Sequence, residues 1–278
     1  MYDGIQNSVF SSQVLEPLLA RLTKDKSLEI TLISFEKEEI SVHELLQRIP
    51  ACDRLHLIIG KKLPFFGRWT LLFAAYQLKC ILQRLSFDHI LARGPLAGFI
   101  TLWALEKNSK KLSQDFIDDM PEVTIQARGL CAEEYRYEKH SRPKKKLVGF
   151  KNPVQDLIYR FMYNSLKNIE FLVYNKANSE NVTIEAVSPA LKEYLIQIFH
   201  TQASHITIAQ NDIPQKISPE QISLWRQEIR EKLHIPEDFL VYTYCGSYKP
   251  WQCAPETVIY FSEQLKDNKK IFFFNFIT

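Results

Sequence analysis

The sequence predicts an α/β protein in which parallel strands alternate with helices. Short apolar runs bounded by charged residues recur along the 278 residues. Each run is followed by a longer segment with helical spacing of its apolar positions, which is typical of βαβ units. Composition agrees, because 46% of the residues are hydrophobic, 24% are charged and only 8 are glycine, as in ordinary globular proteins. The length leaves room for about two domains.

The elements follow one another in a regular order. The expected strands cover residues 28–35, 55–60, 89–93, 123–127, 182–187, 206–209, 239–245 and 270–276. The expected helices cover residues 8–23, 68–85, 96–107, 132–137, 154–178, 189–199, 219–233 and 256–265. Ser188 and Pro189 stand where an N-cap serine and a first-turn proline belong, so the helix beginning there is well defined by sequence.

A proline-bearing segment divides the chain. Residues 210–237 carry Pro214, Pro219 and Pro236 around one amphipathic helix, which predicts an N-terminal domain of residues 1–209 and a second domain of residues 210–278. The second domain has only two expected strands, and no strand precedes the glycine-bearing loop near the amino end. We therefore expect one nearly complete Rossmann-like domain, the first part of another, and a chain that lacks pieces at both ends.

Composition also excludes several classes of protein. The five cysteines are odd in number and form no C-x-x-C pair, which disfavours zinc knuckles and disulfide frameworks and favours a reducing cytoplasm. No basic and apolar leader opens the chain, and the apolar segment 69–85 is too short and too polar to cross a bilayer. The net charge of +3 gives no indication of a nucleic-acid partner.

Two expected strands end in an arginine followed by a glycine. Arg93-Gly94 and Arg128-Gly129 stand at carboxyl ends, where open parallel sheets bind their ligands. Two guanidinium groups there could hold one anionic group, since their geometry suits phosphate and carboxylate oxygens. The alternative is an internal salt bridge between Arg128 and the acidic pair Glu133-Glu134.

Two further glycine-bearing turns open expected helices. Gly4 lies in a turn whose free N–H groups could face a phosphate, although a plain helix-entry loop capped by Asn7 or Ser8 explains it equally well.

The second turn follows the strand at 239–245. Gly246, Ser247 and Lys249 occupy the place of a diphosphate-binding turn, with a glycine for close backbone approach and two side-chain donors. The turn matches neither G-x-G-x-x-G nor a Walker loop, and the histidines show no metal-ligand spacing.

Basic clusters lie beside apolar aromatic residues in two places. Residues 139–146 contain five lysines and arginines, and Lys61-Lys62 precede the aromatic stretch 63–69. The cluster at 139–146 could meet nucleic acid or anionic lipid, and the two clusters together would suit contact with an anionic membrane at its inner face. The alternatives are a solvated loop and a half-buried core helix.

Taken together and in order, these segments resemble the glycosyltransferase family 4-like branch of the GT-B glycosyltransferases. The resembling stretches are residues 2–4 with 8–10, 91–95, 126–135, 185–188, 244–247 and 251–252. The resemblance implies two Rossmann-like domains facing each other, the first holding a glycan or lipid-linked acceptor such as a cell-envelope polysaccharide precursor. The second would hold the nucleotide-sugar donor, and the sugar would be transferred with retention of configuration and without a bound metal or other cofactor.

The resemblance also assigns residues. Gly4 would face the donor phosphates, Arg93 and Arg128 would border the cleft, and Ser247 and Lys249 would approach the diphosphate. Many relatives have a histidine near the position of Arg93, and an Arg with a Lys in the last turn. No catalytic residue can be assigned.

The family's E-x7-E motif, which contacts donor sugar and nucleotide, would lie beyond Thr278. We therefore expect millimolar donor binding and no turnover from the 278-residue chain. The alternative function is a noncatalytic anion-binding or membrane-surface-binding module. A dinucleotide oxidoreductase is disfavoured because the glycine fingerprint is missing.

Overall fold

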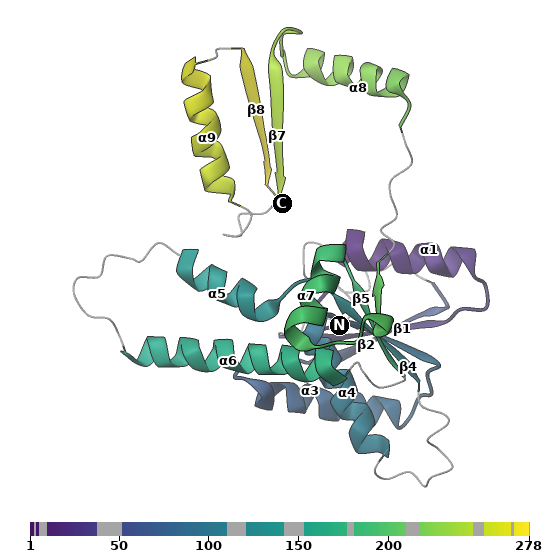
Figure 1. Ribbon diagram of the computed structural model, residues 1–278. Helices are drawn as coiled ribbons and strands as arrows, with labels where there is room; N and C mark the ends of the chain where they lie inside the picture. The colour runs from purple at the N-terminus through teal and green to yellow at the C-terminus, as the bar shows by residue number, and fades with distance from the viewer. Residues whose placement is uncertain are drawn as a thin grey trace. The chain divides into compact units, whose positions relative to one another are not determined.

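The protein is described by a computed structural model that covers residues 1–2, 4–5, 10–37, 52–109, 121–141, 153–176, 181–209, 217–246, 253–267 and 270–277. These residues fall into two compact units (Figure 1). Unit 1 comprises Met1–Glu134 and Gly149–Ala209, and unit 2 comprises Tyr135–Val148 and Gln210–Thr278.

Unit 1 alternates strands and helices as expected. Its strands are β1 (Ile30–Glu36), β2 (Leu55–Lys61), β3 (His89–Arg93), β4 (Glu122–Ala127), β5 (Val182–Ala186) and β6 (Ile206–Ile208). Its helical elements are η1 (Ser11–Leu15), α1 (Glu16–Lys24), α3 (Arg68–Leu82), α4 (Gly94–Ser109), the start of α5 (Cys131–Ser141), α6 (Pro153–Lys176), α7 (Pro189–Phe199) and η3 (Ala203–His205). The helix expected at residues 8–23 is a π-helical turn, η1, followed by α1, and α4 begins two residues earlier than expected.

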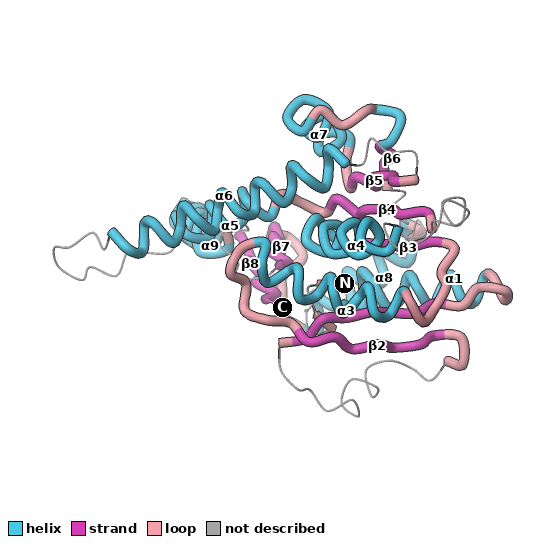
Figure 2. The backbone as a smooth tube through the Cα atoms, turned by 90° about the horizontal axis from the view of Figure 1, so that it is seen from below, coloured by secondary structure: helices cyan, strands magenta, loops and turns pink. Residues whose placement is uncertain are grey.

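Unit 1 contains a four-stranded parallel sheet in the order β3-β4-β5-β6 and a separate parallel pair, β1-β2. The connections β3-α4-β4, β4-α6-β5 and β5-α7-β6 all step in the same direction along the sheet. Right-handed crossovers therefore place these helices on one face, where α4 packs on α6 and α6 on α7. Figure 2 shows the strands β3 to β6 side by side.

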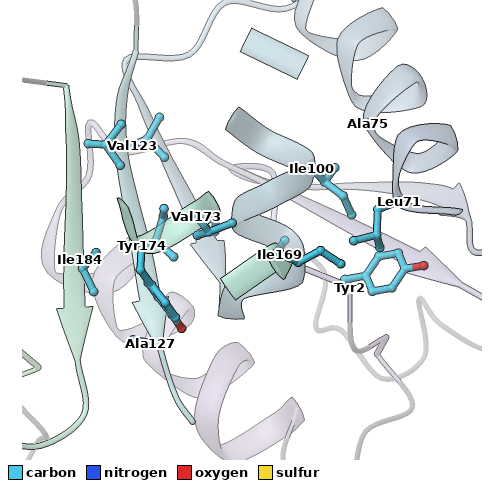
Figure 3. Close-up of a cluster of buried hydrophobic side chains, with 14 of the residues drawn as sticks. Tyr2, Leu71, Ala75, Ile100, Val123, Ala127, Ile169, Val173, Tyr174 and Ile184 are labelled. Atoms are coloured by element: carbon cyan, nitrogen blue, oxygen red, sulfur yellow. The ribbon is translucent and has the colours of Figure 1, made fainter. Parts of the chain in front are cut away.

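The core of unit 1 lies between this sheet and its helices. Alternate residues of β4 and β5 are buried, among them Ile125 and Ile184, both fully. They meet the buried faces of α3, α4 and α6, from which Leu71, Ile100 and Ile169 project (Figure 3). The buried side chains thus recur at every second residue along the strands and about every 3.6 residues along the helices.

The opposite face of the same strands is polar. Thr124 Oγ1 lies 2.8 Å from His89 Nε2 and 3.1 Å from Thr183 Oγ1, and Gln126 Nε2 donates to Glu185 Oε2 at 2.7 Å. The sheet of unit 1 therefore has one apolar and one hydrogen-bonded polar face, unlike parallel sheets that are buried on both sides.

Unit 2 contains one complete crossover. Besides the end of α5, the described elements of unit 2 are α8 (Pro219–Lys232), β7 (Leu240–Gly246), α9 (Ala254–Asp267) and β8 (Ile271–Ile277), and β7, α9 and β8 form the crossover. Strands β7 and β8 are parallel, with Leu240 opposite Ile271 and Gly246 opposite Ile277. The predicted pairing of these two strands through the helix between them is confirmed. Phe261 of α9 packs between Tyr242 and Phe273, at ring-centroid distances of 4.6 and 4.7 Å.

Candidate functional site

Two arginines mark the carboxyl edge of the sheet in unit 1. Arg93 is the last residue of β3, and Arg128 follows the last residue of β4, its parallel neighbour. Both side chains are half-buried. Parallel pairing brings the two strand ends to the same edge, so the topology itself places the arginines near each other.

Gln13 connects the two arginines. Its side-chain oxygen, Oε1, accepts from Arg93 Nη2 at 2.7 Å and from Arg128 Nη2 at 3.5 Å. Two cationic groups therefore converge on one neutral oxygen. An amide oxygen carries no net charge, so the Gln13 contact itself neutralises neither guanidinium group.

Local sequence explains why Gln13 lies there. It sits in the π-helical turn η1, four residues before Pro17, which has no amide N–H to bond back to the Gln13 carbonyl. That carbonyl accepts from Arg93 Nη1 at 3.4 Å. The sequence analysis missed Gln13, although the proline one turn later is a visible sign of an altered helix start.

The glycines after the arginines have different surroundings. Gly94 has a φ of 80°, which favours glycine, and a Cβ built there would meet nothing within 4 Å. The start of α4 beside Arg93 is therefore open. Gly129 is closed in, because a Cβ there would lie 2.3 Å from Glu134 Oε1.

The predicted alternative for Arg128 is a salt bridge with the acidic pair Glu133-Glu134. Within the described ranges Arg128 forms no ion pair, and Glu133 accepts a hydrogen bond from Tyr163 Oη at 2.8 Å. The Glu134 carboxyl group instead lies against Gly129. The acidic pair at the start of α5 therefore leaves the Arg128 guanidinium to Gln13.

A buried glutamate lies beside the start of α5. Glu170 of α6 is only 2% exposed, and its Oε1 accepts from the Ala132 amide at 3.3 Å. Burial raises the pKa of Glu170 to about 7. Burial also raises the pKa of the Cys131 thiol, an effect that the nearby Glu170 charge increases. Sequence analysis missed Glu170, although it interrupts the apolar spacing of Leu166, Ile169 and Val173.

Gly4 occupies a buried turn against β1. Its φ is 81°, and a Cβ there would lie 2.7 Å from Glu36 Oε2. The other carboxylate oxygen of Glu36 accepts from the Ile5 amide at 2.8 Å and from Ser34 Oγ at 2.6 Å. The turn thus places a backbone N–H against an anionic group that the protein itself supplies.

The residues predicted for the donor side, Gly246, Ser247 and Lys249, belong to unit 2. Gly246 ends β7 opposite Ile277, as expected for a turn that opens at a strand end. Ser247 and Lys249 lie outside the described residues, as does most of the basic cluster at 139–146. In the parts of the chain that are described, no three His, Cys, Asp or Glu side chains gather in a way that could hold a metal ion. None of the described helices has both the length and the apolarity needed to cross a bilayer.

The chain resembles several solved structures. It matches a glycosyltransferase from Rickettsia africae ESF-5 with a TM-score of 0.53 and 12% identity, over 100% of this chain and 67% of that one. The fold is of the GT-B type. This confirms the predicted Rossmann-like α/β architecture, and at this identity the likeness shows the fold alone.

Two further matches are looser. A structure assigned as a UDP-N-acetylglucosamine 2-epimerase from Listeria monocytogenes gives a TM-score of 0.47 at 11% identity, over 94% of this chain and 58% of that one. A UDP-N-acetylglucosamine 2-epimerase from Rickettsia bellii gives 0.40 at 13% identity, over 87% and 54%. The chain thus spans little more than half the length of these two proteins. No protein-family model and no curated protein matches the sequence.

Proposed function

We propose that this protein takes part in transferring a sugar from a nucleotide-sugar donor to a glycan or lipid-linked acceptor, with retention of configuration and without a bound metal. The observation that carries the proposal is the convergence of Arg93 and Arg128 on Gln13 at the carboxyl edge of a GT-B-type sheet. Ligands of open parallel sheets bind at this edge.

The two arginine guanidinium groups suit the chemistry of sugar transfer. A sugar leaves its donor with a nucleoside diphosphate as the leaving group, and negative charge develops on the phosphate oxygens during the reaction. Preorganised guanidinium groups stabilise such charge most where water is excluded. An anion at Arg93 and Arg128 would replace the neutral Gln13 oxygen, and the open start of α4 at Gly94 leaves room for it.

The proposal assigns the acceptor to residues 1–209 and the donor to residues 210–278. In it Gly4 lies in the acceptor-side loop that faces the donor phosphates, and Gly94 and Gly129 border the cleft beside Arg93 and Arg128. Gly246, Ser247 and Lys249 form the turn toward the donor diphosphate. The solved structure named as a glycosyltransferase supports the proposed sugar transfer through its fold.

The first test measures binding of a nucleoside diphosphate and its sugar esters by calorimetry. Arg93→Gln and Arg128→Gln should each weaken binding about tenfold, since one charge-assisted bond contributes roughly 1.5–3 kcal/mol. Arg21→Gln is the matched control, because Arg21 is an exposed arginine of α1 in the same unit. Equal losses in all three variants would argue against a specific anion site.

A second measurement separates the two candidate functions. Release of nucleoside diphosphate in the presence of polyprenyl-linked or glycan acceptors, abolished by Lys249→Ala, is expected of a sugar transferase. Saturable binding without any release would favour the noncatalytic anion-binding module. Absence of saturable binding would contradict both.

A further inference from the structure

Helix α3 is apolar on two opposite faces. Leu71, Ala74 and Leu78 face the core of unit 1. On the opposite side Trp69, Phe73 and Tyr76 follow one another at helical spacing and remain exposed, Trp69 by 65%. A helix that needed only to cover the sheet would carry polar side chains there.

The first half of α6 continues this apolar surface. None of the described side chains from Val154 to Ser165 is buried, whereas the second half contributes Leu166, Ile169 and Val173 to buried positions. Leu157, Ile158 and Phe161 lie on one side of the first half, with Leu157 exposed by 69%. Figures 1 and 2 both show this half extending past the sheet of unit 1.

The two helices meet at an aromatic contact. Phe66, just before α3, lies with its ring 5.4 Å from that of Phe161, and a Cβ at Gly67 would lie 3.3 Å from the Phe161 ring. We call the combined feature the outer α3–α6 surface. It consists of Phe66, Trp69, Phe73, Tyr76, Val154, Leu157, Ile158 and Phe161.

Basic residues predominate in the sequence around the outer α3–α6 surface. Residues 61–84 include no aspartate or glutamate, and their basic members are Lys61, Lys62, Arg68, Lys79 and Arg84. The Arg68 guanidinium lies 5.5 Å from the ring of Trp69. On α6, Arg160 and Lys167 are exposed, and Asp156 is the single acidic residue between positions 154 and 167.

A groove adds apolar area next to Trp69. It has a volume of about 380 Å³ and is lined by side chains of α3, α4 and α6, including Phe99, Trp103 and Leu172. Arg68 lies at its border, as do Glu106 and Lys176, which form an ion pair at 2.6 Å. The aromatic side chains of the surface therefore continue into a recess that an apolar chain could enter.

We propose that the outer α3–α6 surface binds the face of an anionic phospholipid bilayer. Aromatic side chains with exposed apolar rings insert at the level of the headgroups, and flanking lysines and arginines attract the lipid phosphates. The inference rests on this surface alone and not on sugar transfer, although it brings the protein to where lipid-linked acceptors are found.

The test is sedimentation of the full chain with lipid vesicles in the absence of any nucleotide. Binding to phosphatidylcholine vesicles that contain about 30 mol% phosphatidylglycerol should exceed binding to pure phosphatidylcholine about tenfold and should weaken with salt. Trp69→Ser with Phe161→Ser should reduce binding at least about tenfold. The matched control is Ile198→Ser with Ile208→Ser, because both isoleucines of unit 1 are comparably exposed but lie outside the surface.

A second variant keeps the proposal testable if the serine variant misfolds. Trp69→Phe preserves the aromatic surface, so binding should persist, while quenching of tryptophan fluorescence by brominated lipid should fall sharply. Unchanged quenching would overturn the proposal, as would equal binding to neutral and anionic vesicles or an equal loss in the control. A chain that buries Trp69 in a homodimer, shown by sedimentation equilibrium with protection of Trp69 from soluble quenchers, would also overturn it.

Discussion

The parallel strands of the two units differ in how much of their surface the neighbouring elements cover. In unit 1, Ile125 and Ile184 are fully buried because α4, α6 and α7 lie on the same face of four strands. In unit 2, Leu240 and Tyr242 of β7 are exposed, and no described residue of α8 is buried. An apolar strand therefore buries its side chains only where several strands and helices share one face.

The helices of unit 2 show the same difference. Helix α9 packs on the strand pair through Phe261, yet Ile259 and Tyr260 remain more than half exposed. Similar apolar side chains in unit 1 remain exposed only in particular places, notably on the outer α3–α6 surface. Exposed apolar side chains are thus general in unit 2 and local in unit 1, which is why the local surface indicates a binding role.

The largest expected effect compares two isoleucines. Ile184→Ala, at a fully buried position of β5, should lower the free energy of unfolding of unit 1 by about 2–5 kcal/mol. Ile259→Ala, at a position 59% exposed in α9, should change that of unit 2 by less than about 0.5 kcal/mol. Urea unfolding followed by tryptophan fluorescence measures both. Similar losses of unfolding free energy in the two variants would contradict the difference in burial between Ile184 and Ile259.

Two glutamates should make the free energy of unfolding depend on pH in opposite directions. Burial raises the pKa of Glu170 to about 7, so its charging destabilises unit 1 as the pH rises from about 4.5 to 7. Glu170→Gln should therefore increase stability above pH 7 by about 1–3 kcal/mol and flatten this dependence. Hydrogen bonds from its own backbone and from Ser218 lower the pKa of Glu220, so the stability it contributes is lost as the pH falls through its titration.

The measurement is the free energy of unfolding between pH 4 and 8 for both variants. Glu220→Gln serves as the comparison at an exposed helix start. If Glu170→Gln left the pH profile of unit 1 unchanged, Glu170 would not titrate as a buried group.

The smallest expected effect compares two helix caps of the same chemistry. Ser188 Oγ accepts from the Leu191 amide and Ser218 Oγ from the Gln221 amide, each at 3.2 Å and each before a proline. Ser188→Ala should cost unit 1 about 1 kcal/mol, while Ser218→Ala should cost unit 2 about 0.5 kcal/mol. The reason is that the first cap is partly buried and the second is exposed to competing water. Thermal unfolding measures both losses, with the Ser→Gly variants as controls. A larger loss for Ser218→Ala than for Ser188→Ala would contradict the prediction.

The sequence determined the positions of the strands and helices and the chemistry of several turns. Apolar spacing located β3 to β8, and Ser188 with Pro189 defined the start of α7, because these signals act within a few residues. The Arg-Gly pairs indicated the carboxyl edge of the sheet because they too are local signals, each directly following a strand. Parallel pairing of β3 with β4 then followed from the alternation of elements.

Only the tertiary structure decided which side chains meet. Gln13 reaches two arginines that are 80 and 115 residues away in sequence. Glu170 became buried because α6 packs against the sheet beside the start of α5. The outer face of α3 stayed exposed although its apolar pattern resembles that of a buried helix. Periodicity specifies a local conformation, whereas contact and burial depend on distant elements that share the same space.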